Sequence, residues 1–304
     1  MTAFGRAVLA ATHNPVARSI FTRTGPGRAL ADRFVAGDTL DQAVSAVGGL
    51  NAGGMAVSLD LLGEEVRDEQ TALEARDAYL ACLDRIGVDR LDANISVKLT
   101  QLGLAFDRRL ARSSVERLAR RAGELGTTVT IDMEDSRFTA DTIDIYAEAQ
   151  AAQGNLGVCL QAALHRTPED LERIAPLGGH IRLCKGAYVE PAAVAHQSKD
   201  GVDAAFVRLL ESLMGDDRVR PAIATHDDRM LSRAEELGRT RSAPYEFQML
   251  YGVRGDRQRS LVDAGHDLRI YVPYGSEWYA YLTRRLAERP ANMMFFLRAL
   301  AGKS

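Results

Sequence analysis

Length, composition and charge already exclude several classes of protein. The chain has 304 residues, of which 46% are apolar and 26% charged, so it can bury a large core and is not a disordered tail. Its formal net charge of −3 provides no basic stripe for nucleic acid, and no nucleic-acid partner is expected.

In chain order, a helical arm precedes a regular alternation of strands and helices. Residues 1–46 form the predicted N-terminal helical arm, and residues 47–304 form the predicted catalytic barrel. The strand candidates are 54–60, 94–99, 128–133, 156–161, 180–185, 221–226, 245–250 and 269–273. Helical patterns fill each gap between them. Eight strands alternating with helices are typical of an α/β fold, the (βα)8 barrel.

Several of these strands alternate apolar and polar residues. In the segment ISVKL, which ends at Leu99, Ser96 and Lys98 lie on one face and the apolar residues on the other. Parallel strands covered by helices usually read as unbroken apolar runs. The alternation therefore indicates that one face of the sheet meets a ligand.

In a barrel of this kind, the carboxyl ends of the strands form the active site. Polar residues fall at these ends on several strands, and their joint occurrence favours a site over a set of unrelated barrel residues. These candidates are Lys98, Asp132, Gln161, Arg182, Lys185, Thr225, His226, Gln248 and Tyr271. His226 has no second ligand at metal spacing, so no metal site is expected.

The loop that follows the strand at 180–185 carries a second signal. Gly186 comes after Arg182 and Lys185, and a glycine there permits close backbone approach to a pyrophosphate. The short motif is weak by itself. No GxGxxG or Walker loop occurs in the chain, so a Rossmann cofactor site is not supported.

The last predicted helix has a polar face. Tyr281, Arg284, Arg285 and Glu288 are spaced i, i+3, i+4 and i+7 and share one side. On spacing alone, a solvated stripe with an Arg284–Glu288 pair is the leading interpretation. Two adjacent guanidiniums also suit bidentate binding of a carboxylate or phosphate.

Cysteine usage and hydropathy favour a cytoplasmic location. The three cysteines show no CxxC pairing, and reduced thiols are expected. The first twenty residues lack an apolar core followed by a cleavage site, and no uncharged apolar run of about 18 residues occurs. We therefore expect a cytoplasmic protein, with peripheral contact to the inner face of the membrane left open.

The motifs together resemble those of the proline dehydrogenase family, in its short bacterial single-function form. The resembling segments are ISVKLT, Asp132–Glu134, the strand end at Gln161, RLCKGAY, ATHD, YEFQMLYG and YVPYGSEWYAYLTRRLAER, which extend from about residue 50 to 292. The last motif is long and specific. The resemblance implies a distorted (βα)8 TIM barrel with noncovalent FAD over the strand ends.

The resemblance also assigns roles to residues. Arg284, Arg285 and Lys98 would hold the proline carboxylate, while Tyr281, Tyr271 and Leu250 would pack around its ring. Asp132 and Arg182 match the family's active-site acid and flavin-side arginine. The implied FAD contacts are Met133, Gln161, Lys185, Gly186, Ala187, Thr225 and His226, with Gln248 and Glu288 as supports of the flavin.

The implied reaction is oxidation of L-proline to Δ1-pyrroline-5-carboxylate, the first step from proline to glutamate, by hydride transfer to flavin N5. Electrons would pass to a quinone, and a pyrroline-5-carboxylate dehydrogenase is a candidate partner. Two departures from the family pattern are Val189, where an aromatic residue is common, and Asp227, which we expect to cap the next helix.

Three alternatives remain at this point. A Schiff-base aldolase would use Lys98 or Lys185 as its nucleophile. Methylenetetrahydrofolate reductase is a second flavin barrel of similar architecture. A non-enzymatic protein could bind an anionic metabolite without turnover.

Overall fold

Eight parallel strands close into a single barrel in the computed structural model, which describes residues 31–63, 66–279 and 281–282. The strands pair in chain order, and β8 returns to pair with β1. Their bounds are β1 Ala56–Leu61, β2 Ala93–Val97, β3 Val129–Ile131, β4 Leu156–Gln161, β5 Gly179–Cys184, β6 Val219–Ala224, β7 Glu246–Leu250 and β8 Leu268–Tyr274. The predicted barrel is confirmed.

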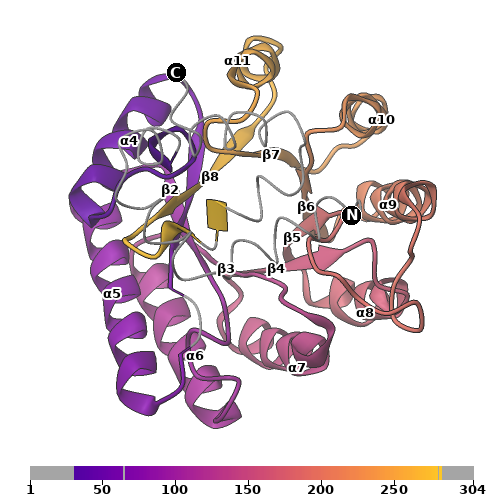
Figure 1. Ribbon diagram of the computed structural model, residues 1–304. Helices are drawn as coiled ribbons and strands as arrows, with labels where there is room; N and C mark the ends of the chain where they lie inside the picture. The colour runs from indigo at the N-terminus through magenta and orange to yellow at the C-terminus, as the bar shows by residue number, and fades with distance from the viewer. Residues whose placement is uncertain (1–30, 64–65, 280, 283–304) are drawn as a thin grey trace, which may run out of the picture.

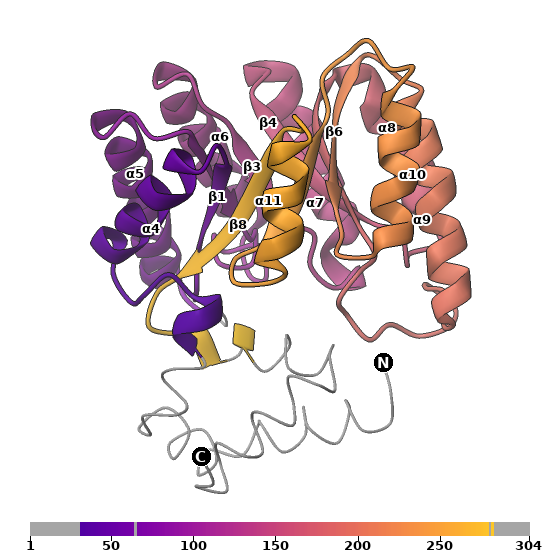
Figure 2. The same cartoon turned by 90° about the horizontal axis from the view of Figure 1, so that it is seen from above.

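Helices surround the barrel as an outer ring (Figure 1), and Figure 2 shows them along their length. Their bounds are α4 Leu40–Ala52, α5 Glu69–Val88, α6 Arg108–Glu124, α7 Ser136–Gln153, α8 Thr167–Ile174, α9 Lys199–Met214, α10 Asp228–Gly238 and α11 Gly255–Asp263, with a 3-10 turn η1 at Ala175–Leu177. Among the described residues, no helix is long and apolar enough to cross a membrane.

Local sequence explains where several helices begin. A short polar side chain precedes the first turn and accepts backbone N–H groups that have no partner within the helix. Asp68, Asp107 and Ser198 do this for α5, α6 and α9, and Asp227 does it for α10. The expected capping role of Asp227 is confirmed.

The alternation in the strands separates two environments. Apolar residues such as Val57, Leu59 and Ile95 are fully buried in the core between the barrel and its helices. The intervening residues, among them Ser58 and Ser96, point into the barrel, where they bond to Arg182. The interior of this barrel is therefore polar, whereas layers of branched apolar side chains are usual.

The predicted strands agree with the observed ones to within two residues at each end. At β2, β3 and β6 the observed strands end at Val97, Ile131 and Ala224, so Lys98, Asp132 and Thr225 are the first residues after them. Helix α4 continues through residue 46, where the sequence places the end of the arm, and packs on β1 and β8. The division into arm and barrel stays a prediction.

Gly157 is a point where the barrel wall leaves no room for a side chain. A Cβ at this residue of β4 would lie 2.8 Å from the carbonyl oxygen of His180 on β5. We predict that Gly157→Ala destabilises the protein by about 1–3 kcal/mol, because the strands must separate. Thermal or urea unfolding measures the effect.

Gly48 provides the matched control for this substitution. It lies on α4 and is exposed, and a Cβ added to it would have no other atom within 4 Å. Gly48→Ala should stabilise the helix by up to about 1 kcal/mol. Equal stability of the two variants would contradict the close approach at Gly157.

Candidate active site

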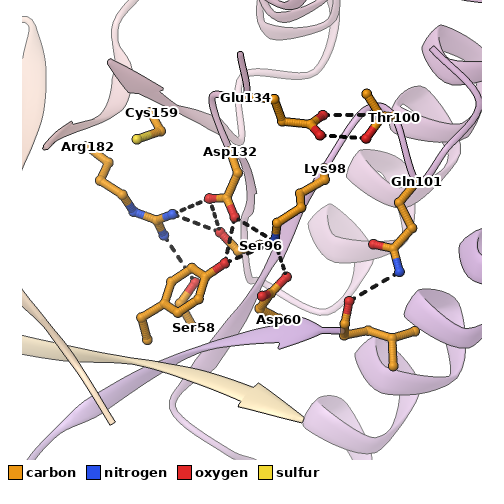
Figure 3. A network of polar contacts seen from close by, with 12 residues as sticks. Ser58, Asp60, Ser96, Lys98, Thr100, Gln101, Asp132, Glu134, Cys159 and Arg182 are labelled. Carbon is orange, nitrogen blue, oxygen red and sulfur yellow. Dashed lines mark hydrogen bonds and ion pairs between the residues drawn. The ribbon is translucent and has the colours of Figure 1, made fainter. Parts of the chain in front are cut away.

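Lys98 and Asp132 come directly after β2 and β3 and point toward each other (Figure 3). Both contact the Tyr271 hydroxyl, which comes from the middle of β8. The Lys98 ammonium donates to Asp60 Oδ1 at 2.7 Å and lies 3.4 Å from Asp132 Oδ2. The Tyr271 hydroxyl donates to the same Asp132 oxygen at 2.6 Å. Asp60 and Asp132 are buried, so the part of this group that is open at the strand ends is Lys98 and Tyr271.

Arg182 lies deeper in the barrel, beneath this group. From the middle of β5, its Nη1 pairs with Asp132 Oδ1 at 2.5 Å and donates to Ser96 Oγ at 2.9 Å. Its Nη2 donates to Ser58 Oγ, and its guanidinium carbon lies 5.2 Å from the centre of the Tyr271 ring. One buried arginine thus joins side chains from several strands.

Two cations and two carboxylates set the protonation states here. Burial alone would raise the pKa of Asp132, but Lys98 and Arg182 outweigh it and hold this pKa below its ordinary value. Burial also favours neutral Lys98, yet Asp60 and Asp132 raise the lysine pKa. Burial raises the pKa of Asp60. Lys98 is therefore charged, and Asp132 is a weak base.

A buried polar column supports Arg182 from below. Arg182 Nε donates to Gln248 Oε1 at 2.6 Å, and Gln248 Nε2 donates to Glu246 Oε1, also at 2.6 Å. Glu246 is bound in turn by Arg269 at 2.8 Å and lies 3.2 Å from His180 Nε2. Gln248 is nearly fully buried, so it acts on the open end of the barrel through Arg182.

The rim of β4 and β5 contains a second group of predicted residues. Gln161 donates to the carbonyl of Glu134, whose carboxylate accepts from the Thr100 backbone at 3.0 Å. Gly186 has a φ of +109°, and a Cβ there would lie 2.9 Å from Gln161 Oε1. Ala187 follows it and is exposed. The positive φ favours glycine at 186, and a Cβ there would also displace the Gln161 amide.

Lys185 lies among carboxylates outside the barrel interior. Its Nζ is 2.5 Å from Asp203 Oδ1 and 2.7 Å from Asp227 Oδ2. Beyond β6, His226 Nε2 accepts from the backbone N–H of Leu250 at 3.2 Å, and Thr225 accepts from the backbone of Asp227. These contacts link the ends of β5, β6 and β7.

Tyr281 and Tyr271 belong to one apolar cluster near the end of β8. Tyr281 is buried with Phe34, Leu62 and Leu282, and partly buried Tyr271 packs against this cluster. Met133 is buried after β3. Three predicted residues, Arg284, Arg285 and Glu288, lie outside the described residues.

Sequence reasoning missed several residues of the site. Asp60 and Ser58 are fully buried and bind Lys98 and Arg182, respectively. Ser96 was placed on the polar face of its strand, but its contact with Arg182 was not foreseen. The segment VSLDL at residues 57–61 has the same alternation as the strands that were singled out. That pattern identifies Ser58 and Asp60 as inward-facing. Nothing in it shows that Asp60 meets Lys98, which lies 38 residues away.

Comparison with known proteins identifies the family. A family model described as proline dehydrogenase matches residues 43–298. Proline dehydrogenase 1 of Bacillus subtilis subsp. natto is 39% identical over 292 residues, covering 94% of each chain. Proline dehydrogenase of Deinococcus radiodurans is 34% identical over 281 residues, covering 89% of this chain and 90% of its own.

Solved structures of proline utilization A share the fold. The protein from Bdellovibrio bacteriovorus, inactivated by N-propargylglycine, superposes with a TM-score of 0.81 over 86% of this chain at 24% identity. Another, with proline bound in remote sites, gives 0.73 over 88% at 27% identity. The matched region spans only 33% and 31% of those longer chains. The chain described here belongs to the proline dehydrogenase family, and is an oxidoreductase that acts on proline.

Proposed function

We propose that this protein oxidises L-proline to Δ1-pyrroline-5-carboxylate with bound FAD and passes the electrons to a quinone. Family membership supports proline oxidation in proline catabolism. The observation that carries the finer proposal is the charged group at the strand ends, where Lys98, Asp132 and Tyr271 lie above buried Arg182. Such a group suits a small zwitterionic substrate.

The residues at the rim of β4 and β5 fit FAD. Gly186 provides a side-chain-free backbone where a Cβ would strike Gln161, and Ala187 beside it is exposed. Arg182 and Lys185 supply positive charge from the same strand and its end. We propose that these five residues, with Met133, Thr225 and His226, hold the cofactor. When bound, FAD supplies an acceptor for the hydride that leaves the ring carbon next to the proline nitrogen.

Lys98 is the described residue best placed to bind the proline carboxylate. It remains charged and is the only cation of the central group that is open to the strand ends among the described residues. We propose that Arg284 and Arg285 join it, and that Leu250, Tyr271 and Tyr281 pack on the ring. Leu250 and Tyr271 are register partners that face the same side of β7 and β8. Binding at one end of the ring presents the other end for oxidation.

Asp132 orients its neighbours in this scheme. It accepts from Ser96, Tyr271 and Arg182, and its pKa is held low, so it is poorly suited to remove the amine proton. Its role is to fix Lys98 and Arg182 in position. A guanidinium held beneath the reacting group stabilises negative charge that develops there.

The Schiff-base alternative fits the site less well. A nucleophilic lysine must be neutral, but two carboxylates raise the pKa of Lys98. Lys185 is bound between Asp203 and Asp227. Lys98 is thus held as a cation, and the Lys185 amine is occupied by two carboxylates.

The first test is the visible spectrum of the purified protein before and after anaerobic addition of L-proline. We expect a yellow protein that bleaches, because proline reduces the flavin. A yellow protein that does not respond to proline would mean that flavin is bound but that the substrate is a different molecule. A protein that stays colourless after incubation with FAD would overturn the cofactor proposal. Reoxidation by a soluble quinone then tests the acceptor.

Lys98→Met tests the carboxylate anchor. Loss of a charge-assisted hydrogen bond costs about 1.5–3 kcal/mol, so the proline KM should rise about tenfold or more. Lys199→Met is the matched control, because Lys199 is exposed and pairs with Asp203 on the outside of the barrel. Steady-state kinetics below the melting temperature measures both. An unchanged KM in Lys98→Met would show that Lys98 does not bind the proline carboxylate.

Gln248→Met tests the support of Arg182. Methionine fills similar space but cannot accept from Arg182 Nε, so we expect kcat/KM to fall roughly tenfold, the cost of one hydrogen bond to a charged group. Gln150→Met is the control: Gln150 is equally buried, but it bonds to the backbone of Leu156 and Leu177. That variant should lose stability and retain kcat/KM. Equal kinetics in the two variants would argue against a positioning role for Gln248.

A further inference from the structure

Two cysteines lie together on the inner wall of the barrel. Cys159 on β4 and Cys184 on β5 have their sulfur atoms 3.5 Å apart. Cys159 is the register partner of Arg182, beside which it appears in Figure 3. Cys184 is the last residue of β5 and is half-buried. Cys184 is therefore partly open toward the same strand ends as the active site, with Cys159 buried beside it, and the proposed reaction uses neither.

The register of the two strands disfavours a direct disulfide. Cys159 pairs with Arg182, and Gln161 pairs with Cys184, so the cysteines are diagonal neighbours. Diagonal neighbours on a sheet face lie about 7–8 Å apart at their Cα atoms, beyond the range of about 4.4–6.8 Å that a disulfide spans. Closing the bond would require two adjacent strands of a closed barrel to move.

The spacing suits a single atom between the two sulfurs. With metal–sulfur bonds of about 2.3 Å and tetrahedral angles, two thiolates on one centre lie about 3.8 Å apart. The observed 3.5 Å is close to this value without strand movement. The hydrogen bond between the two sulfurs lowers the pKa of Cys184, and nearby Arg182 also favours the thiolate.

The charge of Arg182 determines which kind of ligand the two thiols can bind. Arg182 repels a divalent cation, and the Asp132 carboxylate that could offset it is already bound by Arg182, Ser96 and Tyr271. A neutral thiophilic compound is free of this repulsion. We propose that Cys159 and Cys184 form a two-thiol site for neutral trivalent arsenicals, and that its occupation stops proline oxidation.

The chemistry is a condensation without change of oxidation state. An organic arsenoxide exchanges its oxygen for two sulfurs: two As–S bonds form, both S–H bonds break, and the two protons leave with the oxygen as water. Arsenic remains trivalent. The organic group then projects from the wall beside Arg182 into the space above the strand ends, where it excludes the substrate.

Cys82 provides an internal control. It is fully buried in the core, where α5 packs against the barrel, and burial raises its pKa to about 12. Its sulfur has no second cysteine beside it, since the other two cysteines of the chain are paired on β4 and β5. A reagent that must bind two thiols should therefore not react with Cys82.

The test treats the protein, as purified, with one equivalent of phenylarsine oxide. Intact-mass measurement should show one phenylarsenic adduct in the wild type and in Cys82→Ala, with loss of most proline oxidation. Cys159→Ser and Cys184→Ser should each show no stable adduct and keep their activity in the reagent. 2,3-Dimercaptopropanol should reverse the inhibition, and equimolar 2-mercaptoethanol should not.

Several outcomes would overturn the proposal. An unmodified wild type would mean that the pair does not bind the reagent. An adduct that persists in both serine variants would place it elsewhere, and reversal by the monothiol would indicate attachment through one sulfur. An adduct without inhibition would remove the link to the active site. The mass readout does not depend on the cofactor, so it stands even if the FAD proposal fails.

Discussion

The ion pair between Arg182 and Asp132 organises the interior of this barrel. Both side chains are largely removed from water, and each charge would be costly without the other. Lys98 and Asp60 complete a set of two cations and two carboxylates. Ser58, Ser96 and Tyr271 supply further donors and acceptors, so a hydrogen-bond network connects this polar interior.

Glu246 stabilises this group of charges from the side of the barrel away from the strand ends. Its carboxylate accepts from Gln248 and Arg269 and faces His180, and these contacts hold its pKa well below the usual range despite burial. Gln248 connects Glu246 to Arg182, since its oxygen accepts from Arg182 and its nitrogen donates to Glu246. Because every link is directional, Arg182 is fixed in one orientation. A layered apolar core could not impose that orientation.

Exposure divides this network into a supporting part and a reactive part. Asp60, Ser58, Gln248 and Glu246 are buried and hold other side chains. Lys98 and Tyr271 are partly exposed at the strand ends, where substrate arrives. The same division explains the placement of Lys185, whose partners Asp203 and Asp227 belong to α9 and to the cap of α10. At the rim, Lys185 is thus bound by carboxylates from the helices. In the interior, Arg182 and Lys98 are bound by carboxylates from the strands and the residues that follow them.

The sequence by itself determined the barrel and most of the strand-end residues. The period of two assigns each side chain of a strand to one face, and eight strands separated by helices leave few topologies. The long C-terminal motif identified the family, although Arg284, Arg285 and Glu288 lie outside the described residues. The pairing of inward residues was decided only by tertiary structure. Asp60 with Lys98, Gln248 with Arg182, and Cys159 with Cys184 come from segments 38, 66 and 25 residues apart. Alternation tells which face a residue occupies, but strand register and closure of the barrel decide which residue it meets.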